Sequence, residues 1–156
     1  MDVRIGLDDA ARHAIAQGLG RVLGDTFTLY LETHRFHWNV KGPRFTTLHQ
    51  LFMEQYTELW NALDEIAERI LTLGFPAPGT PSELSELSSI EPAASLPTAD
   101  GMLAQLLAGH EALVRTVRTV LPLAQEAGDE STAALLSDRL VIHEKTAWML
   151  RAMLAE

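Results

Sequence analysis

The chain has 156 residues, 47% of them hydrophobic, and a formal net charge of -9 at pH 7. This length suits one domain, residues 1–156, with a single core, while the negative charge argues against a general nucleic-acid surface and suits a protein that attracts cations. Cysteine is absent, which excludes disulfides and thiolate metal sites. No apolar run approaches the roughly 20 residues of a membrane span, and the N-terminus lacks a secretory signal pattern, so we expect a cytoplasmic protein.

The first long helix is predicted to begin near Leu7–Asp9, where acidic residues favour a helix start, and to run to about Asn39. Its helically spaced apolar line ends in His34 and His37, which should therefore point roughly the same way. Glycines weaken this helix, and we interpret three of them as close-packing positions: Gly18, Gly20 and Gly24.

A second long helix is predicted from Phe45 to Leu73, a stretch without proline or glycine. Besides its main apolar face it carries a mixed stripe at helical spacing: His49, Met53, Tyr56, Trp60, Asp64, Ala67, Glu68 and Leu71. The apolar members predict that this face is covered too, so its polar members need partners.

Asp64 and Glu68 are four residues apart, so both carboxylates lie on one side of the helix and could hold a cation. At about 1.5 Å per residue, His49 lies roughly 22 Å from Asp64 and roughly 28 Å from Glu68 along a continuous helix. One chain therefore cannot bring the three to one metal. If they share a site, a second copy supplies half of it, with two helices antiparallel about a two-fold axis.

The remaining chain adds a long connector and two more long helices. Gly74-Phe-Pro-Ala-Pro ends the second helix, and about two dozen residues precede the third, enough for a crossover along the bundle. Within it, Thr80, Pro81 and Glu83 predict a capped short helix to Leu87. The third helix is expected over 98–127, with Pro122 kinking or shortening it and Gly128 ending it.

The fourth long helix is expected over 129–155, with these residues on its apolar side: Leu135, Leu136, Leu140, Val141, Trp148, Met149 and Met153. No stretch predicts a strand or a repeat. The predicted fold is all-α, a ferritin-like four-helix bundle whose long crossover between the second and third long helices carries a short extra helix.

Several segments together resemble the Dps family of mini-ferritins: residues 33–45 (THRFHWNVKGPRF), Leu48-His49, Asp64-Glu-Ile-Ala-Glu-Arg-Ile and His143-Glu-Lys-Thr-Ala-Trp-Met-Leu-Arg. The resemblance covers nearly the whole chain. It implies a hollow dodecamer that oxidises Fe(II), preferentially with hydrogen peroxide, stores ferric mineral inside, and thereby limits oxidative stress.

Carried over by position, the resemblance assigns the ferroxidase ligands to a two-fold interface. His37 and His49 come from one subunit, and Asp64 and Glu68 from its neighbour. His34 is then a structural histidine, and we expect structural or surface roles for His13, His110 and His143. Trp38 and Trp60 are expected near the site, where aromatic rings could intercept oxidising equivalents.

Met53 departs from the family, which usually has an acidic residue one turn after the second histidine. A thioether is a poor ligand for ferrous iron compared with a carboxylate, so the second iron position is expected to be weak. The resemblance also implies acidic pores near the start of the last helix, with Asp129, Glu130 and Asp138 as candidates. A family acid is replaced there by Ala134.

Three functional classes remain open. The leading one is a peroxide-dependent ferroxidase and iron store. The second is a cage that sequesters metal with weak activity because of Met53, and zinc or manganese could occupy the same ligands. The third is a DNA-protecting nucleoid protein, which the acidic N-terminal segment disfavours because it offers little positive charge to the phosphate backbone.

Overall fold

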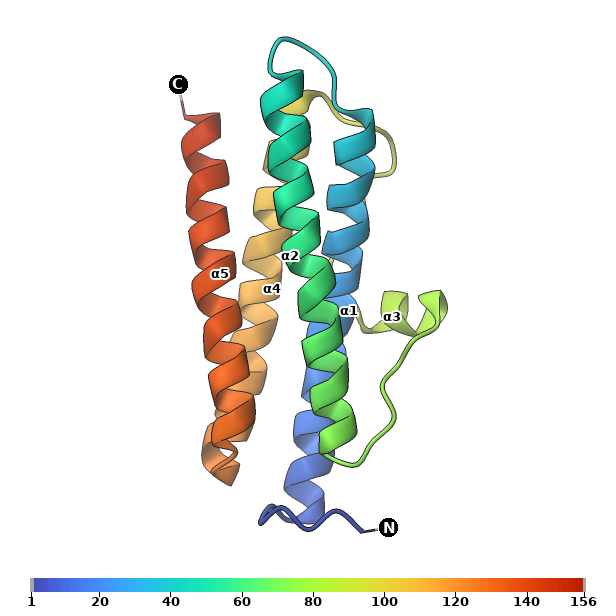
Figure 1. Ribbon diagram of the computed structural model, residues 1–156, viewed down its shortest axis with the longest axis vertical. Coiled ribbons are helices and arrows are strands. Elements are labelled where there is room, and N and C mark those ends of the chain that lie inside the picture. The colour runs from blue at the N-terminus through green and yellow to red at the C-terminus, as the bar shows by residue number, and fades with distance from the viewer. Residues whose placement is uncertain (1, 156) are drawn as a thin grey trace.

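Five helices make up the computed structural model, which describes residues 2–155 and has no strand in that range (Figure 1). They are α1 (Asp9–Asn39), α2 (Phe45–Thr72), α3 (Pro81–Leu87), α4 (Ala99–Ala127) and α5 (Glu130–Leu154). The four long helices form a bundle in which α1 and α5 run one way and α2 and α4 run the other (Figure 1). The predicted four-helix bundle with one long crossover is confirmed.

The helix ends follow the local sequence signals. Asp8 caps α1 by accepting a hydrogen bond of 2.7 Å from the Ala11 N–H. Thr80 and Glu83 form the predicted capping box, because each side chain accepts from the other residue's backbone N–H. Gly128 ends α4 with φ of 71°, a left-handed conformation that glycine adopts without strain. Pro122 does not shorten α4, which continues to Ala127.

The core lies between the four long helices and is mainly apolar. Its largest fully buried side chains include Phe36 on α1 and Phe52 on α2, whose rings lie 6.5 Å apart. Each fully buried Leu, Ile or Phe contributes roughly 1.5–3 kcal/mol relative to an exposed one. This burial fixes which faces of α1 and α2 point outward, and so it fixes the faces that carry the candidate ligands.

The crossover is held against α1 by close backbone contact and by a buried acid. A Cβ on Gly24 would lie 2.9 Å from the carbonyl oxygen of Leu84, so only glycine lets α3 come this close. Asp25 next to it is 0% exposed and accepts hydrogen bonds from the backbone and hydroxyl of Ser89 and from the Thr116 hydroxyl. Asp25, which belongs to α1, therefore ties both the crossover and α4 to this helix.

The predicted inward face of α5 is partly wrong. Trp148, Val141 and Met149 are exposed by 61%, 66% and 41%, whereas Leu136 and Leu150 are fully buried. Apolar residues occur on two faces of this helix, so periodicity alone could not identify the one that faces the core.

Among residues 2–155, no helix combines the length and the apolar character that crossing a membrane requires.

Candidate metal centre

Two of the predicted ligands, His37 and His49, are in direct contact. His37 lies in the last turn of α1 and His49 in the second turn of α2, and the intervening turn contains Gly42 with φ of 108°. Their rings stack with centroids 3.7 Å apart. The Nδ1 atom of His37 lies 2.6 Å from the carbonyl oxygen of His49, and Nδ1 of His49 lies 2.7 Å from the carbonyl oxygen of His37.

This reciprocal pair of hydrogen bonds determines the tautomer of both rings. A carbonyl oxygen only accepts, so Nδ1 of each histidine must carry the proton and donate. The proton on Nδ1 leaves the lone pair of Nε2 available in each neutral ring. An imidazole that donates from one nitrogen to a backbone carbonyl and binds metal with the other is the usual arrangement of histidine ligands.

The carboxylates of Asp64 and Glu68 lie one turn apart on α2, and both residues are exposed. Neither forms a salt bridge within residues 2–155. Arg69, the nearest basic side chain in sequence, instead donates to Asp129 at 2.8 Å and to the Thr132 hydroxyl at 2.8 Å. The two carboxylates are therefore free of the ion pair that would make them ordinary surface acids.

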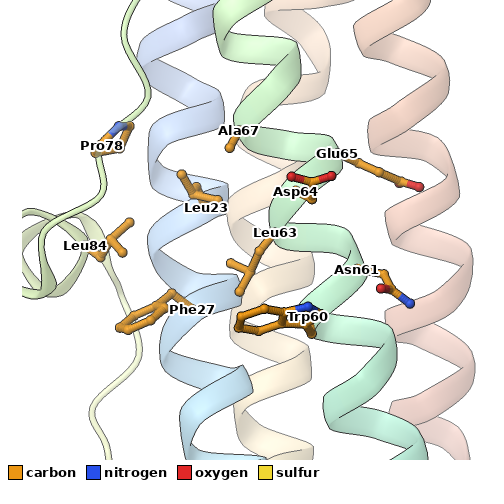
Figure 2. Close-up of a pocket in the computed structure, with 10 residues that line it drawn as sticks. All are labelled: Leu23, Phe27, Trp60, Asn61, Leu63, Asp64, Glu65, Ala67, Pro78 and Leu84. Carbon is orange, nitrogen blue, oxygen red and sulfur yellow. The ribbon is translucent and has the colours of Figure 1, made fainter.

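Asp64 lines an open hollow of about 860 Å³ between α1, α2 and the crossover (Figure 2). Trp60 lies one turn before it on the same side of α2, while the neighbouring Glu65 points toward α5 (Figure 2). Of these two adjacent acids, Asp64 is therefore the one that lies on the same side of α2 as Trp60 (Figure 2).

The two ligand pairs do not meet within one chain. Helix α2 is continuous from Phe45 to Thr72, so His49 and Asp64 lie about 22 Å apart along it. Within residues 2–155, no three His, Asp or Glu side chains come together to hold a metal ion. Each chain therefore presents a histidine half and a carboxylate half at separate places on one face.

The face that carries both halves is open to solvent in the single chain, so the bundle itself does not supply the predicted cover. Met53 and Trp60 are exposed by 43% and 60%, and three further large apolar residues lie nearby on α1 or α2: Trp38, Phe45 and Leu71. Met53 occupies the position on this face one turn after His49, so this position carries a thioether and no carboxylate.

A cluster of aromatic rings fills the space between the two halves. His34 stacks on Tyr56 with centroids 3.9 Å apart, and Tyr56 lies 5.2 Å from the ring of His37. Tyr30 lies 5.4 Å from Trp60, and its hydroxyl is 3.0 Å from Nδ1 of His34. Burial, followed by the nearby Tyr56, raises the pKa of Tyr30, and burial, followed by His37, lowers the pKa of His34.

A polar network that was not predicted from the sequence crosses the bundle. Arg139 on α5 forms two hydrogen bonds with Glu58 on α2, at 2.7 and 2.6 Å, and donates to Nε2 of His143 at 2.9 Å. His143 in turn donates from Nδ1 to Nδ1 of His110 at 2.9 Å. The expectation that these two histidines are structural fits their burial. Only the four-residue spacing of Arg139 and His143 could have suggested that they interact.

Of the three predicted pore acids, Asp129 has structural partners. It is 4% exposed, caps α5 through Thr132 and pairs with Arg69. Although burial by itself raises the pKa of Asp129, hydrogen bonds from Thr132 and Arg69 hold it below its usual value. Glu130 and Asp138 are exposed and remain candidates.

Comparisons with known proteins agree on one family. The ferritin-like domain matches residues 16–156. The DNA protection during starvation protein 2 of Bacillus anthracis is 41% identical over 140 residues, which are 90% of this chain and 96% of that protein.

Solved structures give the same result. The Dps protein from Vibrio cholerae O1, described as a member of a broad superfamily of ferritin-like diiron-carboxylate proteins, has a TM-score of 0.94 at 35% identity and covers 99% of this chain and 98% of its own. DpsC from Streptomyces coelicolor has a TM-score of 0.95 at 30% identity and covers 100% of this chain and 92% of its own.

Proposed function

Because this chain belongs to the Dps group of the ferritin-like family, we propose that it is a ferroxidase that oxidises Fe(II) with hydrogen peroxide and stores the ferric product. The sites lie between two copies of the chain, and the copies assemble into a hollow dodecamer. His37 and His49 of one copy and Asp64 and Glu68 of the next bind the iron, which is the substrate.

The observation that carries this proposal is the tautomer of the histidine pair. Both rings use Nδ1 for the backbone of the other, so in both rings Nε2 is the nitrogen left for a metal. Two neutral imidazoles combined with two carboxylates suit Fe(II), which favours mixed nitrogen and oxygen ligands with open positions for an oxidant.

The position of the carboxylates supports a shared site. They lie too far from the histidines of the same chain and have no cationic partner among residues 2–155, yet they share an exposed apolar face with Trp60. A two-fold axis that packs this face against its copy covers the apolar surface and brings each histidine pair toward the partner's carboxylates. The same two-fold axis thus covers the apolar face and completes the proposed metal site.

The chemistry follows from electron counting. Hydrogen peroxide takes two electrons when its O–O bond breaks, and each Fe(II) gives one. Two irons oxidised per peroxide therefore release no hydroxyl radical. The ligands' task is to hold Fe(II) where peroxide can reach it, and the carboxylates offset the positive charge as Fe(III) forms.

Complementation between two inactive variants tests the shared site. His37→Ala/His49→Ala and Asp64→Ala/Glu68→Ala should each lose fast Fe(II) oxidation when peroxide is added at a low iron-to-chain ratio. Assemblies co-expressed from both variants should recover activity, because random pairing leaves roughly a quarter of the two-fold sites with both halves intact.

Glu54→Ala/Glu65→Ala is the matched control, since it removes two acids from the same helix without touching the proposed ligands. Its oxidation rate should equal that of the unmodified protein. Loss in both ligand variants with no recovery in the mixed assemblies would contradict a site shared between copies.

Met53 favours a second candidate, a cage that sequesters metal with slow turnover. Without a carboxylate at this position, one iron of each pair has fewer ligands. For this candidate we expect Fe(II) to bind tightly but to be oxidised slowly, at a rate that does not saturate as the iron concentration rises. DNA protection, which appears in the name of the Bacillus anthracis relative, is less favoured because the net charge of -9 repels the phosphate backbone.

A further inference from the structure

We propose that a basic hollow between α1, α4 and the crossover binds inorganic phosphate through Arg21 and Arg115. The hollow has a volume of about 270 Å³ and is lined by six residues: Arg21, Ser89, Ala112, Arg115, Thr116 and Thr119. None of them belongs to the candidate metal centre. Phosphate binding there requires neither iron nor an oxidant, so it is independent of the proposed function.

The two arginines of the hollow differ from the other arginines of the chain because neither forms a salt bridge. Of the 12 basic residues, two are lysines, Lys41 and Lys145, so ten are arginines. Within residues 2–155, eight of these ten pair with an acidic side chain. The other two are Arg21 and Arg115, and both are exposed and line this hollow. A chain rich in acids thus leaves two guanidinium groups without an acidic partner at one place.

A hydrogen bond between α1 and α4 holds the two arginines near each other. Nη1 of Arg21 donates to the Thr119 hydroxyl at 3.1 Å, and this hydroxyl donates in turn to the Thr116 carbonyl oxygen at 2.7 Å. Thr119 lies four residues after Arg115, so both side chains lie on the same side of α4, one turn apart. Two like charges at this spacing repel each other, and a bound anion would offset the repulsion.

Asp25 lies behind the hollow and leaves both guanidinium groups available. Its buried carboxylate accepts from the Ser89 N–H at 2.6 Å, the Ser89 hydroxyl at 2.9 Å and the Thr116 hydroxyl at 2.5 Å. These donors stabilise the carboxylate within the fold. Because the hydroxyl protons of Ser89 and Thr116 point toward Asp25, the guanidinium N–H groups are the donors left for a ligand. Even with Asp25 counted, the formal charge of the three groups is positive.

The chemistry and the size of the hollow together select a small oxyanion. A guanidinium group donates two parallel N–H groups to two oxygens of a phosphate, and two guanidinium charges match the phosphate dianion. Pockets for drug-sized ligands have volumes of roughly 300–1,000 Å³. The hollow is smaller than that, at about 270 Å³, so it suits inorganic phosphate better than a nucleotide.

The negative net charge of the chain does not prevent a small anion from binding here. At physiological ionic strength, exposed charges more than about 8 Å apart are largely screened, so the groups around the hollow determine the local potential. Glu111, one turn before Arg115 on α4, is already paired with Arg151. Duplex DNA is different, because it would extend beyond the hollow over the surrounding acidic surface.

Phosphorus NMR tests the proposal on iron-free protein in a phosphate-free buffer at neutral pH and physiological ionic strength. Without iron, no phosphate is held by ferric ions. The resonance of added inorganic phosphate should broaden in a saturable way when the protein is present. Arg21→Gln and Arg115→Gln should each weaken binding roughly tenfold or more, because each removes charge-assisted hydrogen bonds.

Arg118→Gln is the matched control, since it removes the same charge from the next turn of α4, outside the hollow, where Arg118 pairs with Glu144 at 2.6 Å. Phosphate binding should be unchanged in this variant. An equal loss in Arg118→Gln would show that net charge alone determines binding, and the absence of saturable broadening with the unmodified protein would show that the two arginines only offset Asp25. Either result overturns the proposal.

Two further measurements distinguish phosphate from other occupants of the hollow. A DNA duplex that the unmodified protein retards in a gel and Arg21→Gln/Arg115→Gln does not, without broadening of the phosphate resonance, would assign the hollow to nucleic acid. Light scattering should give the same mass for this double variant and the unmodified protein. A smaller assembly would show that the hollow binds an acidic group of a neighbouring copy, and it would overturn phosphate binding as the gel result would.

Discussion

Replacing His110 with leucine is expected to remove a large part of the acid sensitivity of this bundle. His110 on α4 is 2% exposed, and the groups that interact with it are His143 and Arg139 on α5, with Glu58 on α2 paired to Arg139. Burial, followed by the positive charge of Arg139, lowers the pKa of His110 from 6.5 to about 3. Burial, His110 and Arg139 lower the pKa of His143 as well.

Acid destabilises the bundle through His110 because the pKa of this residue is lower in the folded chain than in the unfolded chain. The unfolded chain binds a proton at His110 below about pH 6.5, whereas the folded chain does not bind it until about pH 3. The contribution to stability is therefore complete above pH 6.5 and is lost as the pH falls toward 3. At about pH 5 the loss from His110 alone is about 2 kcal/mol, since each pH unit between the two pKa values is worth about 1.4 kcal/mol.

Urea denaturation followed by circular dichroism, at about pH 7.5 and about pH 5 and at a fixed protein concentration, measures the effect. The free energy of unfolding should fall between the two pH values by about 2 kcal/mol less in His110→Leu than in the unmodified protein. Absolute stability at neutral pH is not the test, because the substitution also removes the acceptor of the His143 N–H.

His13→Leu is the matched control, since His13 is exposed. The free energy of unfolding of this variant should change with pH as that of the unmodified protein does. Carboxylates titrate in all three proteins and cancel in the comparison. An equal pH-dependent loss in His110→Leu and in the unmodified protein would refute the assignment of acid sensitivity to this histidine.

Two further predictions concern the metal centre and the crossover. Met53→Glu places a carboxylate one turn after His49 and should increase the Fe(II) bound per chain in anaerobic calorimetric titrations. Met149→Glu is the control, because it adds the same charge on α5. An equal number of Fe(II) ions bound per chain in the two variants would contradict the role given to position 53. Gly24→Ala should lower the free energy of unfolding by roughly 1–3 kcal/mol, because its Cβ would lie 2.9 Å from the Leu84 carbonyl oxygen. Gly79→Ala, which meets nothing within 4 Å, should change stability little, and equal urea midpoints for the two glycine variants would show that the crossover does not need this close approach.

The local sequence determined the helices and most of their ends. Periodicity and the absence of breakers identified α2, and the residues Thr80 and Glu83 defined the start of α3, because caps depend on side chains within one turn. The length of the connector indicated the crossover. The sequence also placed the histidine pair and the carboxylate pair too far apart along one helix to share a metal, and this separation is confirmed.

Other features depended on tertiary packing. The faces of α5 could not be distinguished, because apolar residues occur on both and only the core decides which is buried. Glu58, Arg139 and His110 lie on three helices, and no sequence pattern links side chains that are brought together by the fold alone.

The same reason applies to the metal centre. The sequence suggested His37 and His49 as ligands, but only the turn between α1 and α2 shows that each ring donates to the other's backbone and so presents Nε2. The sequence likewise contains Tyr30 and His34 at helical spacing, and only the packed structure shows the hydroxyl on the imidazole and the rings that connect both halves. Residue type and spacing are properties of the chain, whereas protonation and contact depend on the three-dimensional surroundings of each group.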